Sequence, residues 1–262
     1  MSGITTIGII GGHGWMGRAL GTALLNSKQI TPENLLVSSR SGGNAYDAWP
    51  GVQDLRDNQA LVDRADLIVL SVRPDQLGSL TLSVSDKPVI SLLAMAPCKA
   101  IANRTGSQRI IRAMPNAAAD IGEAYMPWYA TPEATRADRE CAQQLLGSCG
   151  KARELNTEPE LDYMTALTGA GPAYPALLAS AMLAHAKANG IADDLAFEAV
   201  MQTLSGGCQL LSHLNTNPTD MVNRLIDYQG TTAKGLQRMM DEGFNATVMA
   251  GLTAAHAAAT DR

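Results

Sequence analysis

Aromatic and charged residues are both scarce in this chain. Of its 262 residues, 4% are aromatic and 17% are charged, and the net charge is −5. Proteins that bind nucleic acids usually carry a basic face or aromatic side chains on which bases stack. The composition therefore predicts no nucleic-acid partner, and the low charge argues against a disordered chain.

Cysteine and histidine are few and scattered. The chain has four of each, namely Cys98, Cys141, Cys149 and Cys208, and His13, His185, His213 and His256. The cysteines form no C-x-x-C pair, and the histidines lack the spacing of metal ligands. We therefore expect neither a disulfide framework nor a metal site. Scattered thiols are typical of a reduced, cytoplasmic protein.

A long, strongly apolar run is also missing. The apolar residues near the N-terminus follow no basic segment, which favours a first strand over a signal peptide. Residues 161–186 hold only one charged residue, Asp162, but glycines and prolines interrupt them and most of the others are small. Because alanine contributes little to membrane insertion, this segment predicts a buried helix and no membrane partner.

Charge and alanine are distributed unevenly along the chain. Residues 1–158 contain 15 basic and 15 acidic residues, whereas residues 159–262 contain 5 and 10 and carry the whole net charge of −5. Both parts contain 20 alanines, although the second is shorter. This shift predicts two domains, residues 1–158 and residues 159–262.

Short, continuous apolar runs characterise the first part. They predict strands at residues 5–10, 34–38, 67–72, 89–93, 109–113 and 123–129. Helical patterns lie between some of them, at residues 18–27 and at 58–64, where Asn58 is the expected cap. Continuous rather than alternating apolar runs suit strands that helices cover on both faces. The first part is therefore predicted to be an α/β domain with a doubly wound parallel sheet.

Strand patterns stop near residue 158. The remainder predicts helices at about residues 160–168, 172–189, 193–214, 218–226, 231–242 and 245–259. Gly190 and Gly243 stand where helices would end, a position that favours glycine. We therefore expect the second domain to be all-α.

A glycine-rich motif follows the first predicted strand. Gly12, His13, Gly14, Trp15, Met16 and Gly17 fit the pattern G-x-G-x-x-G. Between a strand and a helix, these glycines permit a tight turn and a close approach of a pyrophosphate to the helix N-terminus. The motif predicts dinucleotide binding, the alternative being a plain turn between strand and helix.

The end of the second predicted strand indicates which dinucleotide binds. Sites for NAD usually place Asp or Glu there to bind the ribose hydroxyls. This chain instead has Ser39 and Arg40, with Ser on either side and no acid. Hydroxyls and a guanidinium suit the 2′-phosphate of NADP. We therefore predict that NADP(H) is preferred over NAD(H), unless Arg40 is merely an exposed loop residue.

Four further motifs follow in order along the chain. They are Ser71-Val72-Arg73-Pro74, Arg112-Ala113-Met114-Pro115-Asn116, Ala166-Leu167-Thr168-Gly169-Ala170-Gly171-Pro172-Ala173-Tyr174 and Gly230-Thr231-Thr232. Together with the glycine loop, this set resembles the pyrroline-5-carboxylate reductases, NAD(P)H enzymes that make proline. The resemblance covers about residues 4–259.

The resemblance implies a Rossmann-type domain followed by a helical dimerisation domain that interlocks with a second subunit. It also implies a homodimer or larger oligomer acting on a small-molecule substrate. The implied cofactor-binding residues are Gly12, His13, Gly14, Trp15, Met16, Gly17, Ser39, Arg40, Asn58, Ser71, Val72, Arg73, Pro74, Leu92, Leu93, Ala94 and Asn116. The implied substrate-binding residues are Asn116, Asp227, Gly230, Thr231 and Thr232.

The two threonines are the expected catalytic residues. Reduction of a cyclic imine needs a hydride on carbon and a proton on nitrogen, and a hydroxyl such as that of Thr232 can orient the nitrogen and relay a proton. The amides of Gly230 to Thr232, at a helix start, can hold a carboxylate. Capping of that helix is the alternative role for Thr231 and Thr232.

One departure from the family pattern leaves the substrate open. The family has Ser-Pro-Gly before Gly-Thr-Thr, whereas this chain has Asp227, Tyr228 and Gln229. The carboxylate of Asp227 would repel a substrate carboxylate nearby. A different imine, a keto or hydroxy acid, and a non-catalytic NADP-binding regulator therefore stay open as alternatives. Reduction of a keto acid usually needs a Lys or His acid near the nicotinamide; Lys234 is the best-placed lysine, but no motif assigns it that role.

Overall fold

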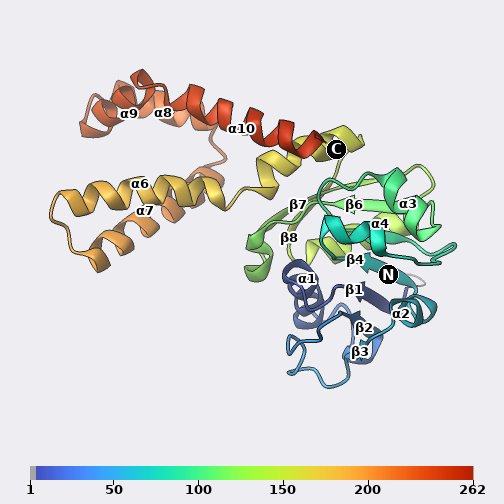
Figure 1. Ribbon diagram of the computed structural model, residues 1–262. Coiled ribbons are helices and arrows are strands. Elements are labelled where there is room, and N and C mark those ends of the chain that lie inside the picture. Colours follow the sequence, from blue (N-terminus) through green and yellow to red (C-terminus); the bar gives the residue numbers. More distant parts are fainter. Residues whose placement is uncertain (1–3, 262) are drawn as a thin grey trace. The chain divides into compact units, whose positions relative to one another are not determined.

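The computed structural model describes residues 4–261 (Figure 1). Its first compact unit contains an eight-stranded sheet in the order β3-β2-β1-β4-β5-β6-β7-β8. The strands are β1 (Ile7–Ile10), β2 (Leu35–Ser38), β3 (Gln53–Leu55), β4 (Leu67–Leu70), β5 (Val89–Ser91), β6 (Ile110–Ala113), β7 (Ala124–Ala130) and β8 (Gly150–Glu154). The order of the first six is that of the Rossmann fold, as predicted.

Both faces of this sheet are buried. In β1, Ile7 and Ile9 belong to one apolar cluster and Ile10 to another, because successive side chains of a strand point to opposite faces. Helices α1 (Trp15–Asn26) and α4 (Arg136–Gly147) contribute to the first cluster, and α2 (Asn58–Arg64) and α3 (Cys98–Thr105) to the second. This two-sided cover explains why the strands are continuous apolar runs.

The outer strands differ from the sequence prediction. β7 runs antiparallel to β6, so the sheet is mixed, and β8 pairs parallel with β7. β3 and β8 were not predicted, because β3 has three residues and β8 is largely polar and only partly buried. Asn58 is not the cap of α2; the side chain of Asp57 accepts the Gln59 N–H instead.

The second compact unit is all-α, as predicted. It consists of Gly171–Ala254, whereas the chain up to Ala170 and the segment from Ala255 onward form the first unit. Its helices are α6 (Ala173–Ala188), α7 (Asp193–Leu214), α8 (Pro218–Asp227), α9 (Thr231–Asp241) and most of α10 (Phe244–Thr260). Gly190 and Gly243 have positive φ values of 77° and 86° just after helices end. Within residues 4–261, no helix is long and apolar enough to span a bilayer.

The two compact units divide after Ala170. This division lies twelve residues beyond residue 158, the point at which the composition of the sequence changes. Helix α5 (Glu158–Met164) belongs to the first unit, and its Leu161 is fully buried there. A π-helical turn, η4 (Thr165–Gly169), follows α5. Three 3₁₀ turns complete the first unit, namely η1 (Pro32–Asn34), η2 (Pro74–Ser79) and η3 (Ala117–Ile121).

Candidate functional site

The glycine loop between β1 and α1 leaves no room for side chains. A Cβ on Gly12 would lie 2.7 Å from the Val37 Cβ, and one on Gly17 would lie 2.5 Å from the Gly11 carbonyl oxygen. Gly11 has a φ of 84°, and the N–H groups of Gly11 and Gly12 both donate to the Ser38 carbonyl, at 2.8 and 3.0 Å. Helix α1 then starts with no acidic residue in its first turn, which leaves its N-terminus open to an anion.

A crevice of about 260 Å³ lies beside this loop. It is at the carboxyl ends of β1, β2 and β4, where open α/β sheets bind their ligands. None of the residues that line it is an Asp or Glu; they are Ile10, Gly11, Gly14, Ser39, Arg40, Ser41, Asn58, Ser71, Val72, Arg73, Gln76, Ser79 and Leu80. The sequence-predicted residues from three separate strand ends therefore meet in one place.

Two polar side chains of this crevice differ in whether they have a hydrogen-bond partner in the protein: Asn58 has one, and Ser39 has none. The hydroxyl of Ser39 is buried and has no partner in the protein, which is costly unless a ligand or water supplies one. Asn58 accepts a hydrogen bond of 2.7 Å from the hydroxyl of Ser38. Asn58 is thus held in place by the end of β2, and Ser39 is available to a bound group.

The side chain of His13 lies in a different hollow from this crevice. Only 8% of the side chain is exposed, and Nε2 lies 3.0 Å from the Asp54 carboxylate. The ring packs edge-on against Tyr46, at a centroid distance of 5.4 Å. The His13 side chain, which was predicted to bind the cofactor, thus lines the hollow with Tyr46 and Asp54 instead, and its backbone remains the candidate contact.

Tyr46 is a residue of this site that the sequence did not reveal. Its buried hydroxyl donates to the carbonyl oxygens of Gly12 and Gly17, at 3.0 and 3.2 Å. Burial raises the pKa of the Tyr46 phenol far above its ordinary value, so it stays a donor. A single tyrosine in a polar loop has no pattern that could have identified this role.

Trp15 connects the glycine loop to the turn after Asn116. Its indole N–H donates to the Asp120 carboxylate at 2.7 Å, and the Arg18 guanidinium lies 3.3 Å from the same oxygen. Asp120 belongs to η3, which begins directly after Asn116. Trp15 is 58% exposed, so its ring stays open to solvent or a ligand.

Asn116 is buried and both of its polar groups are engaged. The side-chain N–H donates to the Thr168 carbonyl at 2.8 Å, and the side-chain oxygen accepts from the Ala118 N–H at 3.0 Å. Asn116 thus joins the end of β6 to the turn η4. Leu92 and Leu93, which follow β5, are buried, so the accessible groups of this segment are its backbone and Ala94.

The threonine motif belongs to the second unit. Gly230 is the N-cap of α9, and Thr231 and Thr232 are exposed in its first turn. No side chain caps this helix, so helix capping does not account for the threonines. The first amides of a helix have no carbonyl partner within it, which leaves donors free. Asp227, at the end of α8, is exposed nearby in the chain.

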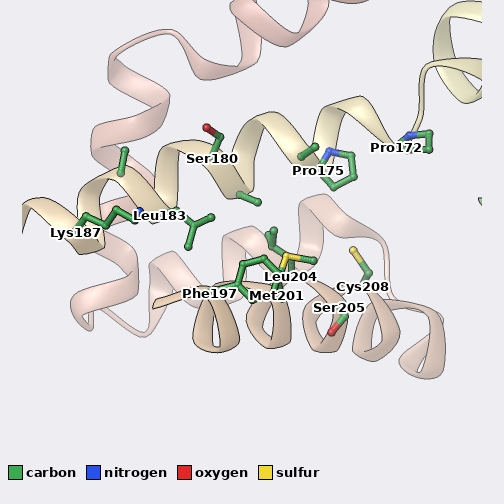
Figure 2. A pocket seen from close by; sticks show the side chains of 13 residues that line it. Pro172, Pro175, Ser180, Leu183, Lys187, Phe197, Met201, Leu204, Ser205 and Cys208 are labelled. Carbon is green, nitrogen blue, oxygen red and sulfur yellow. The ribbon is translucent and has the colours of Figure 1, made fainter. Parts of the chain in front are cut away.

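The second unit also leaves large apolar side chains uncovered. A groove of about 750 Å³ lies between α6 and α7, and Leu183, Phe197 and Met201 face it (Figure 2). Phe197 is 58% exposed, and Leu177, also on α6, is 74% exposed. Exposed apolar area on this scale usually marks an interface.

Two family models match the chain. The model described as pyrroline-5-carboxylate reductase dimerisation matches residues 158–261, and that of NADP oxidoreductase, coenzyme F420-dependent, matches residues 6–95. The pyrroline-5-carboxylate reductase of Glycine max is 30% identical over 260 residues, covering 95% of this chain and 93% of the relative. The chain belongs to the pyrroline-5-carboxylate reductase family. The predicted family and enzyme class, an oxidoreductase, are thereby confirmed.

Other pyrroline-5-carboxylate reductases are also similar to this chain, in sequence or in structure. The Pseudomonas aeruginosa pyrroline-5-carboxylate reductase is 31% identical over 207 residues, 77% of this chain and 76% of the relative. The Plasmodium falciparum pyrroline carboxylate reductase, solved with NADP bound, has a TM-score of 0.86 and 26% identity, covering 99% and 98% of the two chains. A reductive aminase from Aspergillus terreus, at 17% identity and a TM-score of 0.56 over 92% and 95% of the chains, shares the fold alone.

Proposed function

We propose that this reductase transfers a hydride from NADPH to the C=N bond of a small cyclic imine, and that pyrroline-5-carboxylate, which becomes L-proline, is the default substrate. The observation that carries the proposal is the acid-free crevice beside the glycine loop, in a chain that matches the family over nearly its whole length. NADP bound to the Plasmodium falciparum relative supports the choice of cofactor.

The residues present fit NADP(H). A Cβ on Gly11, Gly12 or Gly17 would clash with the protein's own atoms, namely those of Ser71, Val37 and Gly11. Only glycine therefore allows the tight turn whose amides a pyrophosphate would need. The unpartnered hydroxyl of Ser39 and the guanidinium of Arg40 line the same crevice, and they match the donors that a 2′-phosphate requires.

The chain's own groups supply binding and orientation. When bound, NADPH supplies the hydride that adds to the imine carbon. The free amides at the start of α9 hold the substrate carboxylate. If the neutral imine binds, the hydroxyl of Thr232 donates to the ring nitrogen and relays a proton from water that completes the amine. If the iminium ion binds, its nitrogen is already protonated, its N–H donates to the Thr232 oxygen, and hydride addition alone gives the amine. A strong protein acid is unnecessary if the substrate binds as the iminium ion, since position and electrostatics then suffice.

Asp227 supports a second candidate substrate class. It ends α8 three residues before Gly230, it is exposed, and none of the ion pairs within residues 4–261 involves it. Its negative charge favours an imine without a carboxylate, or one with an amine, over pyrroline-5-carboxylate.

A substrate panel tests the function. NADPH oxidation is measured with pyrroline-5-carboxylate, with carboxylate-free cyclic imines and with 2-keto acids, for the wild type and Asp227→Ser. Fastest turnover of pyrroline-5-carboxylate supports the default. Preference for uncharged imines that Asp227→Ser reverses supports the second class. Turnover of keto acids alone, or NADPH binding without any turnover, contradicts imine reduction.

Removal of the Thr232 hydroxyl should lower turnover. We expect Thr232→Ala to reduce kcat about tenfold, the size of one lost hydrogen bond, and Thr232→Ser to retain most activity. Thr253→Ala is the matched control, because Thr253 is an exposed helical threonine whose hydroxyl donates to the Met249 carbonyl. An unchanged kcat for Thr232→Ala would remove this residue from the mechanism.

Removal of the Arg40 guanidinium should erase cofactor preference. We expect Arg40→Ala to raise the NADPH KM roughly 10- to 100-fold, as for loss of a charge-assisted hydrogen bond, with little change in the NADH KM. Arg136→Ala, on the exposed face of α4, is the control. Equal effects on both cofactors would refute the assignment of Arg40 to the 2′-phosphate.

We further propose that the helical unit is stable as a homodimer or larger oligomer. Its uncovered apolar residues and the dimerisation family model support this. Sedimentation of the full chain at micromolar concentration should show at least a dimer, and a monomer would contradict the proposal.

A further inference from the structure

Arg112 is a buried cation near the carboxyl end of β6. Its side chain is 1% exposed, with Nη1 2.5 Å from the Glu158 carboxylate and Nη2 3.3 Å from that of Asp162. Both carboxylates come from α5. Burying such a cluster costs several kcal/mol per ion, so it adds little net stability compared with apolar residues of the same volume. Its presence therefore calls for a role beyond holding the fold together.

Glu158 connects this cluster to the segment that follows β5. The same carboxylate oxygen accepts a 2.8 Å hydrogen bond from the Cys98 N–H, the first amide of α3. The N-cap of α3 is Pro97, which offers no side-chain acceptor, so Glu158 acts as the cap from another helix. The pKa of Glu158 lies below its ordinary value, because the Cys98 N–H and the Arg112 guanidinium outweigh the opposing effect of burial. Glu158 thus fixes the end of residues 92–97.

The cluster also connects to Asn116. Arg112 lies opposite Ser91 in the sheet register, and strands β4 and β5 separate its strand from β1, which leads into the glycine loop. Asn116 follows Arg112 on the same chain segment. Helix α5 runs on into η4, where the Thr168 carbonyl accepts from Asn116. The ion pairs among Arg112, Glu158 and Asp162 are therefore connected to three segments. Glu158 holds the end of residues 92–97, Arg112 leads into residues 114–116, and α5 continues into η4.

We propose that Arg112, Glu158 and Asp162 are positioning residues that set the geometry of these segments for hydride transfer. The inference rests on the proposed function, since residues 92–94 and Asn116 are among the residues that the family resemblance assigns to the cofactor. A displacement of about 1 Å can cost a factor of 10² in rate. The network does not contact the glycine loop, so it acts on kcat more than on NADPH affinity.

A second ion pair on the same strand segment, with a buried carboxylate, provides a control. Arg109 precedes β6 at the opposite, amino edge of the sheet, and its Nη2 lies 2.5 Å from the Asp138 carboxylate, whose side chain is 2% exposed. Asp138 belongs to α4. Its carboxylate still accepts from the Thr135 N–H when Arg109 is removed, and its own N–H still donates to the Thr135 hydroxyl. Arg109→Ala thus breaks a comparable pair away from the three segments.

The test compares Glu158→Ala, Glu158→Gln and Arg109→Ala in the full chain. We expect Glu158→Ala to lower kcat at least tenfold while the NADPH Kd, measured by fluorescence titration, changes less than threefold. Glu158→Gln keeps an acceptor for the Cys98 N–H and should recover kcat to within threefold of the wild type. Arg109→Ala should lower the Tm with kcat within twofold. Equal kcat losses in Glu158→Ala and Arg109→Ala would overturn the proposal.

Hydrogen exchange of the cofactor-free protein gives a readout independent of turnover. In Glu158→Ala, the amides of residues 92–98 and 114–118 should exchange at least tenfold faster than in the wild type, and in Arg109→Ala they should not. Faster exchange with an unchanged kcat would also overturn the positioning role. A wild type that reduces no imine would instead refute the proposed function, and the exchange comparison would still report whether the network holds these segments.

Discussion

Gly17→Ala should abolish tight NADPH binding. The added methyl group would lie 2.5 Å from the Gly11 carbonyl oxygen and 3.0 Å from the Gly12 Cα, and these are backbone atoms that cannot rotate away. The loop or the start of α1 must therefore move, and the amides that would hold the pyrophosphate move with it. We expect the NADPH Kd to rise roughly 100-fold, about 2.7 kcal/mol, and stability to fall by about 1–3 kcal/mol.

Gly147→Ala is the control for this substitution. Gly147 lies at the end of α4, and its φ is not positive. A Cβ there would meet no atom within 4 Å apart from its chain neighbours and the backbone of its own helix. Alanine is the better helix former, so stability should rise by about 0.5–1 kcal/mol and the NADPH Kd should not change. Fluorescence titration measures the NADPH Kd, and thermal unfolding measures the stability. Wild-type affinity in Gly17→Ala would show that the glycine loop does not cradle the cofactor.

Asp138→Ala should cause the largest loss of stability. Asp138 is 1% exposed, and its carboxylate accepts hydrogen bonds from the Arg109 guanidinium and the Thr135 backbone. Its removal leaves the Thr135 N–H without its acceptor and takes the charge partner from Arg109, whose side chain is 30% exposed, so we expect the free energy of unfolding to fall by about 2–4 kcal/mol. Chemical denaturation at neutral pH measures the change. Glu140→Ala removes the exposed Arg136–Glu140 ion pair from the same helix and should leave the denaturation midpoint unchanged.

The same residue should govern unfolding in acid. Burial opposes the charged form of Asp138, but the Arg109 and Thr135 hydrogen bonds outweigh it and hold its pKa below the ordinary 3.8. A lowered pKa in the folded state means that the stabilisation is present above the ordinary pKa and is lost as pH falls through the folded value. Stability of the wild type should therefore fall more steeply below about pH 4 than that of Asp138→Ala. Parallel curves for both proteins would contradict this assignment.

The central strands were predictable because a strand that is buried on both faces consists of consecutive apolar residues, and such a run is visible in the sequence. β1, β2, β4 and β5 are buried and almost wholly apolar, and β6 is apolar apart from Arg112, so each reads as a strand covered on both faces. The glycine loop was predictable for a related reason, since its spacing reflects close backbone contacts that tolerate no Cβ. Local contacts and two-sided burial are properties that a linear pattern can record.

Other features depend on contacts between distant segments. The antiparallel direction of β7 is determined by its neighbours and not by its apolar residues, which would suit either direction. His13 lies 41 residues from Asp54 in the chain, and Trp15 lies 105 residues from Asp120. Tyr46, in a loop without a motif, supports the carbonyls of Gly12 and Gly17. No local spacing predicts such pairs.

The sequence by itself determined the fold class and the family, and it predicted the positions of the cofactor-binding motifs, because each depends on short-range patterns of burial and backbone space. The tertiary structure alone decided which of those side chains face the crevice, leaving Ser39 unpartnered and turning His13 toward Asp54. It also brought Arg112 to Glu158, 46 residues away, and Glu158 to Cys98, 60 residues away. A buried charge must find its partner wherever the fold places one, so such networks become visible only when the chain is folded.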